Sequence, residues 1–182
     1  MYEEIISAGF GGQGVLFVGQ LLAYTALAEG KHVTWIPSYG PEMRGGTANC
    51  TVVIADEPIG SPVSQFPNIA LVFNNPSFER YEPVVRPGGL LVVNQSLVMH
   101  DSTRTDIDVA LVPATELATE LGETRVANLI LLGALLARRP IVAPATVEQV
   151  LIDKLGDQKA HLREINLRAF ARGLALGQVE QA

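Results

Sequence analysis

The residues best placed for chemistry in this sequence form a glycine-rich loop near the N-terminus. Residues 9–14, Gly-Phe-Gly-Gly-Gln-Gly, match the pattern G-x-G-x-x-G and lie between a short apolar run and a long apolar segment. Glycines permit a tight turn and a close backbone approach, and the free N–H groups at the start of a helix can bind an anion. The candidate binding residues of this first loop are Gly11, Gly12, Gln13 and Gly14.

The same pattern is the fingerprint of dinucleotide-binding folds, which also need an acidic residue at the end of the second strand to hold a ribose. The expected second strand ends at residues 35–38, Trp-Ile-Pro-Ser, and the next carboxylate is Glu42. An NAD or FAD site is therefore disfavoured. Two interpretations stay open: the loop contacts an anion or cofactor, or it only turns a strand into a closely packed helix that Gln13 caps.

A second loop, residues 37–46, follows the second strand at the edge where open α/β sheets bind ligands. Its two prolines and three glycines disfavour helix and regular strand, and Arg44 stands directly before two glycines with exposed N–H groups. This combination suits a phosphate or a carboxylate, although an ordered interface loop without a ligand has a similar composition. The candidate residues of the second loop are Tyr39, Gly40, Glu42, Arg44, Gly45 and Gly46.

The sequence contains no recognisable combination of catalytic residues. No Ser or Cys stands beside a His, no carboxylates pair at a suggestive spacing, and no Lys is isolated in an apolar run. The single Cys50 and three scattered histidines show no metal-ligand spacing. We therefore expect neither a catalytic residue nor a metal site in this chain.

The elements that position the two loops alternate along the chain. Short runs rich in Val and Ile alternate with helical stretches, which is typical of a mostly parallel sheet with helices on both faces. This predicts a single α/β domain over residues 1–182, a three-layer sandwich with a Rossmann-like sheet. Strands are expected at residues 4–8, 32–36, 48–55, 69–74, 89–94 and 108–113. Helices are expected at residues 14–29, 77–85, 115–121, 126–138, 146–155 and 159–176.

Two of the expected helices are apolar on every side. Residues 15–28 and 128–137 carry no charge, and a helix that is apolar all round is buried all round. In so small a chain this favours a subunit interface. The alternative is that the two helices pack on each other or beneath the last two helices, over residues 146–176, which we expect to cover the fold from outside.

The composition of the chain disfavours some classes of partner and some cellular locations. The 182 residues suit one core, and 13 Lys plus Arg against 19 Asp plus Glu give a net charge of −6, which disfavours nucleic acid and anionic membranes. Residues 1–6 are acidic where a signal peptide is positive, and glycines interrupt the uncharged residues 5–28. We expect a cytoplasmic protein without a membrane span.

The sequence resembles the γ subunit of 2-oxoacid:ferredoxin oxidoreductases. The resemblance rests on GFGGQGV, on the uncharged helix that follows it, and on VTWIPSYGPEMRGGTANCTVVIADEPIGSP. The similarity continues through PGGLLVVNQSL and RVANLILLGALL, and within the family it is strongest to the 2-oxoglutarate type. The resemblance implies a complex that oxidatively decarboxylates a 2-oxoacid, reduces ferredoxin and forms an acyl-coenzyme A.

The resemblance also implies that different subunits of the complex hold different cofactors. Thiamine diphosphate, Mg²⁺ and iron–sulfur clusters would lie on partner subunits of the α, β and δ types, because this chain lacks a Gly-Asp-Gly thiamine motif at the right spacing and lacks cysteine runs. The isolated chain would be inactive and able to homodimerise. Residues 11–14 and 39–46 would contact coenzyme A or a partner subunit. A stand-alone nucleotide-binding oxidoreductase and a purely structural assembly module are the alternatives.

Overall fold

The fold is built on one six-stranded sheet with the strand order β2-β3-β1-β4-β5-β6. The structure is a computed structural model, and it describes residues 1–39, 46–62 and 64–179. The strands are β1 (Tyr2–Phe10), β2 (His32–Tyr39), β3 (Thr47–Ala55), β4 (Ile69–Val72), β5 (Leu90–Asn94) and β6 (Asp108–Val112). All six lie where the sequence predicts a strand, with boundaries that differ by up to three residues.

The helices lie close to the predicted positions, some between strands and the others after the last strand. They are α1 (Val15–Ala28), α2 (Asn75–Tyr81), α3 (Ala114–Glu120), α4 (Ala127–Arg138), α5 (Pro144–Leu155) and α6 (Arg163–Val179), with short 3-10 helices η1 (Glu82–Val84), η2 (Thr124–Val126) and η3 (Asp157–Leu162). Local chemistry explains several ends. The Asn74 side chain accepts the Ser77 N–H at the start of α2, and Pro144 opens α5 where its missing N–H costs nothing.

The sheet is mixed but mostly parallel. Strands β1, β4, β5 and β6 run parallel to one another, whereas β3 is antiparallel to both of its neighbours, β1 and β2. Strand β1 is central, and its residues 3–9 are buried. Because β3 separates β2 from β1, the carboxyl end of β2 lies about 10 Å from that of β1. The second strand is therefore not the direct neighbour of the first, as it is in a dinucleotide site.

Strand β2 is longer than the sequence predicts. Residues 37–39 were expected to open an irregular loop, but Pro37 pairs with Cys50 and Tyr39 pairs with Ala48 in the ladder between β2 and β3. The expectation for these residues was wrong because β2 is an edge strand, where a proline can turn its missing donor away from the sheet. Residues 40–45, which hold Gly40, Glu42, Arg44 and Gly45 of the second loop, lie outside the described residues.

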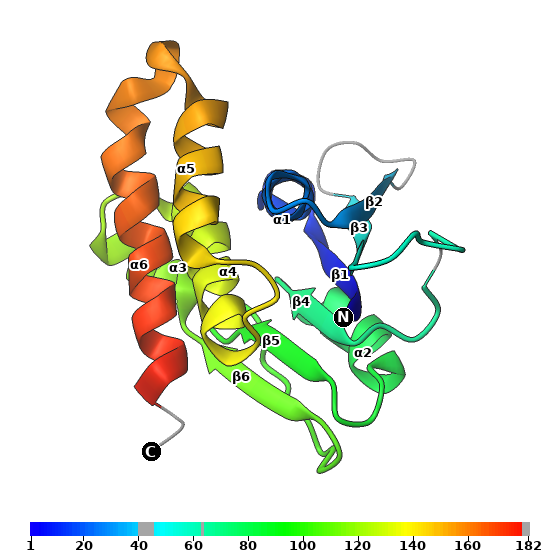
Figure 1. The fold of residues 1–182 in the computed structure, drawn as a ribbon. Coiled ribbons are helices and arrows are strands. Elements are labelled where there is room, and N and C mark those ends of the chain that lie inside the picture. The colour runs from blue at the N-terminus through cyan, green and yellow to red at the C-terminus, as the bar shows by residue number, and fades with distance from the viewer. Residues whose placement is uncertain (40–45, 63, 180–182) are drawn as a thin grey trace.

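The two faces of the sheet are covered unequally. One face packs on α1, α3, α4, α5 and α6, which share a single hydrophobic core. The other face packs on α2 and η1 and on apolar residues of the connection from β5 to β6, including Val98 and Ile107. Figure 1 shows α4, α5 and α6 together on one side of the sheet and α2 on the other. The predicted three layers are present, although α2 is the one α-helix that the described residues place on the second face.

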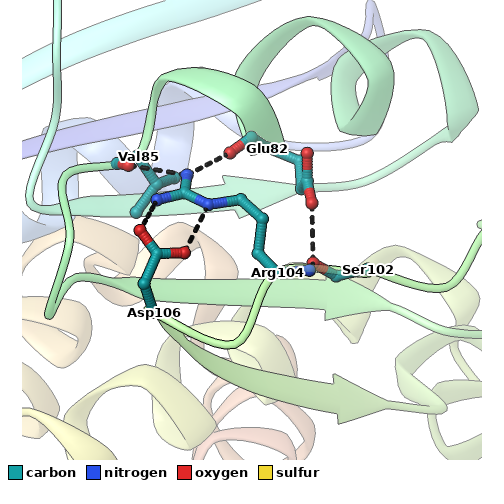
Figure 2. Close-up of polar contacts among 5 residues, drawn as sticks. All are labelled: Glu82, Val85, Ser102, Arg104 and Asp106. Carbon is teal, nitrogen blue, oxygen red and sulfur yellow. Dashed lines mark hydrogen bonds and ion pairs between the residues drawn. The ribbon is translucent and has the colours of Figure 1, made fainter.

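Arg104 holds the connection from β5 to β6 in place on that second face. Its guanidinium donates to the backbone carbonyls of Glu82 and Val85, at 2.8 and 2.7 Å, and makes two further bonds to the carboxylate of Asp106. Ser102 donates to the Glu82 carboxylate at 2.6 Å, so the connection is tied to η1 by side chains from both segments (Figure 2). The guanidinium also lowers the pKa of the Asp106 carboxyl through these hydrogen bonds.

Helix α4 is buried by this chain itself. Its residues 128–136 are all buried, and α6 crosses it at backbone contact distance. A Cβ built at Gly173 would lie 2.0 Å from the Ile130 carbonyl oxygen, and one at Gly133 would lie 2.3 Å from the Phe170 carbonyl oxygen. The expectation that α4 needs a partner subunit was therefore wrong, and packing beneath the C-terminal helices is what occurs.

Helix α1 is only partly covered. It packs on the sheet and on α5, but Tyr24 and Leu27 remain 49% and 54% exposed. The ammonium of Lys154 from α5 lies 4.8 Å from the centre of the Tyr24 ring. Within the described ranges, no helix combines the length and the apolar character needed to cross a membrane. A subunit interface on the outer side of α1 stays a prediction.

Candidate functional site

The first loop lies at the point where the chain connections diverge. The connection after β1 runs through α1 on one face, and the connection after β4 runs through α2 on the opposite face. Such a divergence between the carboxyl ends of neighbouring parallel strands is where open α/β sheets bind ligands. Strands β1 and β4 are these neighbours, so residues 11–14 stand directly over the switch point.

Gln13 fills the crevice between these two strands. Its side-chain oxygen accepts the Phe10 N–H at 2.7 Å and the Asn74 amide at 3.2 Å, and its amide nitrogen donates to the Phe73 carbonyl at 3.4 Å. The expected capping role was wrong, because the N-cap of α1 is Gly14 and no side chain caps it. Gln13 instead ties the loop after β1 to the loop after β4.

Gly14 is required by packing as well as by conformation. Its φ of 79° lies in the left-handed region, and a Cβ at this position would be 2.2 Å from the Asn128 amide nitrogen. The Asn128 amide donates to the Gly14 carbonyl at 3.4 Å. The start of α4 thereby presses directly on the first loop, so this glycine has a structural role whether or not a ligand binds.

The two predicted loops meet in the structure. The Gly11 N–H donates to the Gly46 carbonyl at 3.0 Å, which joins the first loop to the end of the second. Beside this bond lies a hollow of about 360 Å³, lined by residues 10–12, 14–17 and Ala48. Among the described residues, its lining side chains are apolar and none is titratable. These residues can bind an apolar chain or a partner side chain, but they cannot supply an acid or a base.

The thiol of Cys50, which lies near the loops, is not set up for catalysis. Cys50 is fully buried under α1, and burial raises the pKa of its thiol to about 11, so the thiol is neutral at physiological pH. In the part of the chain that the structure describes, no three or more His, Cys, Asp or Glu side chains are grouped to hold a metal ion.

A second hollow of about 190 Å³ lies on the other side of the first loop, and sequence reasoning missed it. The first loop contributes Gly12 and Gln13 to it. The remaining lining residues come from the ends of β4 and β5 and from the starts of α3, η2 and α4: Phe73, Asn94, Leu97, Thr115, Thr124, Arg125 and Ala127. A signal was available in the sequence, because Asn94 ends a predicted strand at the ligand-binding edge of the sheet.

Comparison with known proteins decides the family. Residues 4–176 match the family model described as pyruvate ferredoxin/flavodoxin oxidoreductase. This chain belongs to that family. The resemblance seen in the sequence is thereby confirmed at the level of the family, and so is the α/β fold.

Relatives of two lengths are similar to the chain. It is 35% identical to the 2-oxoglutarate synthase subunit KorC of Methanocaldococcus jannaschii, over 95% of this chain and 92% of the relative. It is 45% identical to the ketoisovalerate oxidoreductase subunit VorA of Methanothermobacter marburgensis, over 71% of this chain. The chain spans only 27% of the VorA length but nearly the whole of KorC.

Solved structures show the same fold. The γ subunit of a keto/oxoacid ferredoxin oxidoreductase from Geobacter sulfurreducens superposes with a TM-score of 0.86 at 25% identity, over 98% of both chains. A 2-oxoglutarate:ferredoxin oxidoreductase from Magnetococcus marinus superposes with a TM-score of 0.88 at 25% identity, over 98% of this chain and 31% of that one. That enzyme was solved with 2-oxoglutarate, coenzyme A and succinyl-coenzyme A bound.

Proposed function

We propose that the chain is the γ-type subunit of a complex that oxidatively decarboxylates a 2-oxoacid, with 2-oxoglutarate favoured, to its acyl-coenzyme A and passes electrons to ferredoxin. The observation that carries this proposal is the end-to-end similarity to KorC, which covers 95% of this chain and 92% of the relative. Its partners would be subunits of the α, β and δ types. A cytoplasmic setting fits the single unpaired thiol of Cys50.

The residues of this chain fit some of the implied cofactors and not others. An iron–sulfur cluster needs several thiolates, and the one cysteine is a buried, protonated thiol. Clusters are therefore assigned to the partner subunits, as is thiamine diphosphate, because this sequence lacks a Gly-Asp-Gly thiamine motif at the required spacing. Coenzyme A fits better, because the apolar hollow beside Gly11 suits its uncharged arm and the neighbouring second loop contains Arg44, a natural phosphate ligand.

In this proposal the first and second loops face the partner that carries thiamine diphosphate. Their backbone N–H groups and Arg44 hold the phosphate end of coenzyme A, and the apolar residues of the hollow line the path of its thiol-bearing arm. The outer side of α1, with Tyr24 and Leu27, extends the same face of the chain toward a partner. The chain thus binds and orients but performs no proton transfer.

The test replaces Arg44 by alanine in the reconstituted complex. An arginine bond to phosphate contributes about 1.5–3 kcal/mol, so we expect the KM for coenzyme A to rise by about 10-fold or more while kcat changes little. The control is Arg172→Ala, which removes an exposed arginine of α6. If Arg44→Ala alters neither assembly nor this KM, the coenzyme A role is wrong and a purely structural role remains.

A further inference from the structure

A buried side chain on the opposite side of the switch point is joined to the first loop by hydrogen bonds. Asn74 lies in the short segment between β4 and α2, and it is 4% exposed. Its amide nitrogen donates to the Gln13 side-chain oxygen at 3.2 Å. The same Gln13 oxygen accepts the Phe10 N–H at 2.7 Å. Asn74 therefore reaches the backbone of the first loop through Gln13.

The backbone sets the direction of both side-chain amides. The Ser77 N–H donates to the Asn74 oxygen at 3.0 Å, which leaves the Asn74 nitrogen to face Gln13. The Phe10 N–H can only donate and the Phe73 carbonyl can only accept, so the Gln13 oxygen faces Phe10 and its nitrogen faces Phe73. Turning either amide over would set two donors or two acceptors against each other. These hydrogen bonds are all made in one arrangement only.

The first loop depends on such outside bonds for its shape. Three of the four residues 11–14 are glycines, and a glycine imposes little conformational preference because it has no Cβ. Gly14 is the N-cap of α1, and Gly12 and Gln13 line the second hollow. The conformation of this loop is therefore set by the hydrogen bonds that reach it from other segments, and the bond from Asn74 is one of them.

Asn74 has two roles that substitution can separate. Its oxygen caps α2, and its nitrogen holds Gln13. Asp and Ser are also good N-cap residues, because each has a side-chain oxygen that can accept the Ser77 N–H. Neither can replace the nitrogen, since a carboxylate has no N–H and the serine side chain is one atom shorter. Both substitutions therefore keep the cap and remove the bond to Gln13.

We propose that Asn74 is a positioning residue for coenzyme A, which acts through Gln13 to hold the first loop in the conformation that receives the ligand. This inference rests on the proposed function, because it requires coenzyme A to bind at this loop. In this role Asn74 touches neither the ligand nor the reacting atoms. Its loss weakens the binding of coenzyme A and leaves the chemical step, which belongs to the partner subunits, at its normal rate.

The first measurement uses the complex reconstituted with its partner subunits. In Asn74→Asp the Gln13 oxygen loses a donor and faces a second acceptor. The loop then occupies the receptive conformation for a smaller fraction of the time, and the apparent affinity falls by that fraction. One hydrogen bond corresponds to about 3- to 10-fold in an equilibrium constant. We expect the KM for coenzyme A to rise by this factor in Asn74→Asp and Asn74→Ser, with kcat nearly unchanged.

Asn75→Asp is the matched control for the added charge. It makes the same substitution one residue further along the chain, and its carboxylate can still accept the Met99 N–H, which donates to the Asn75 oxygen at 2.7 Å. We expect a normal KM in this control. Simple repulsion between a new carboxylate and the phosphates of coenzyme A would instead raise the KM in Asn75→Asp as well, and would leave the uncharged Asn74→Ser normal.

The second measurement tests whether Asn74 acts through Gln13. Gln13→Leu removes the side chain that connects Asn74 to the loop. In that background Asn74→Asp should cause no further rise in KM, because two residues that act through one bond have non-additive effects. A general loss of stability would instead add the two effects. If Asn74→Asp does not fold, Asn74→Ser takes its place in both measurements.

The inference is supported by a raised KM in the Asn74 variants, a normal KM in the control and no further rise in the Gln13→Leu background. It is overturned by a normal KM in both Asn74 variants, even where unfolding shows a lower stability, or by additive effects in the double variant. Arg44→Ala separates this inference from the proposed function. If Arg44→Ala raises the KM and the Asn74 variants do not, only the positioning role is wrong; if none of these variants raises it, the coenzyme A role is wrong as well.

Discussion

The crossing of α4 and α6 yields a quantitative prediction, because the contact between the two helices leaves no space for an added methyl group. In the variant Gly173→Ala the new Cβ would lie 2.0 Å from the carbonyl oxygen and 2.8 Å from the carbonyl carbon of Ile130. Ordinary contacts of this kind begin near 3.4 Å, so the two helices must part by more than 1 Å. The obstacle is backbone and cannot rotate away.

Two opposing effects set the size of the change. Alanine is a better helix former than glycine by about 1 kcal/mol, which stabilises the variant. Overpacking of a tight interface costs about 1–3 kcal/mol, and more where the neighbour is backbone, as it is here. The clash should win, with a net loss of about 1–2 kcal/mol in the free energy of unfolding. For a chain of this size that lowers Tm by about 2–8 °C.

Thermal and urea unfolding of the purified full-length chain measure this loss. Gly60→Ala is the matched control, since a Cβ at Gly60 meets nothing within 4 Å. We expect that control to change the free energy of unfolding by no more than about 0.5 kcal/mol. A Gly173→Ala protein that is more stable than the parent by the helix-propensity term would refute the proposed backbone contact and reopen a partner subunit as the cover of α4.

Three further predictions concern the site. Gln13→Leu leaves the part-buried Phe10 N–H without its acceptor, so urea unfolding should show a loss of about 1–3 kcal/mol; an unchanged midpoint would contradict the bridge. The Glu123 pKa is lowered from 4.5 to about 2 by Arg125, so its stabilising effect is present above pH 4.5 and lost as the pH falls toward 2. Arg125→Gln should therefore flatten the acid limb of stability against pH, and an identical limb would count against the pair. Cys50 should react with a thiol reagent at pH 8 only after unfolding, since burial raises its pKa to about 11; rapid labelling of the native chain would contradict this.

The sequence allowed the layers of the fold to be predicted, because buried strands and helices leave clear apolar patterns. It did not identify what buries them. The uncharged residues 128–137 correctly indicated a buried helix, but apolar character does not say whether the cover is a partner or the same chain. The close contact of Gly133 with Phe170 and of Gly173 with Ile130 is a tertiary feature that single-helix patterns cannot show.

The antiparallel position of β3 could have been deduced. Parallel neighbours need a crossover that usually contains a helix, whereas antiparallel neighbours can be joined by a short loop. No helix was expected between the second and third strands, so their antiparallel pairing follows. The length of β2 could not be read in the same way, because Pro37 disfavours a strand in general and is tolerated here only at the sheet edge.

The candidate site was predicted in part. The contact between Gly11 and Gly46 brings together the two loops that the sequence singled out, although most of the second loop lies outside the described residues. Asn94 and Thr115, which line the second hollow, were missed, although Asn94 ends a predicted strand at the ligand-binding edge of the sheet. That Thr115 lies beside Asn94 is a tertiary contact, which only coordinates reveal.

The central claim, that the chain is one subunit of a 2-oxoacid:ferredoxin oxidoreductase, is tested most directly by anaerobic purification of the untagged protein from its native source. The account predicts co-elution with subunits that carry thiamine diphosphate and iron–sulfur clusters. It also predicts that the material reduces ferredoxin in the presence of coenzyme A and 2-oxoglutarate, in preference to pyruvate or branched-chain 2-oxoacids. A lone monomer that elutes without a thiamine-bearing partner and without this activity would contradict it.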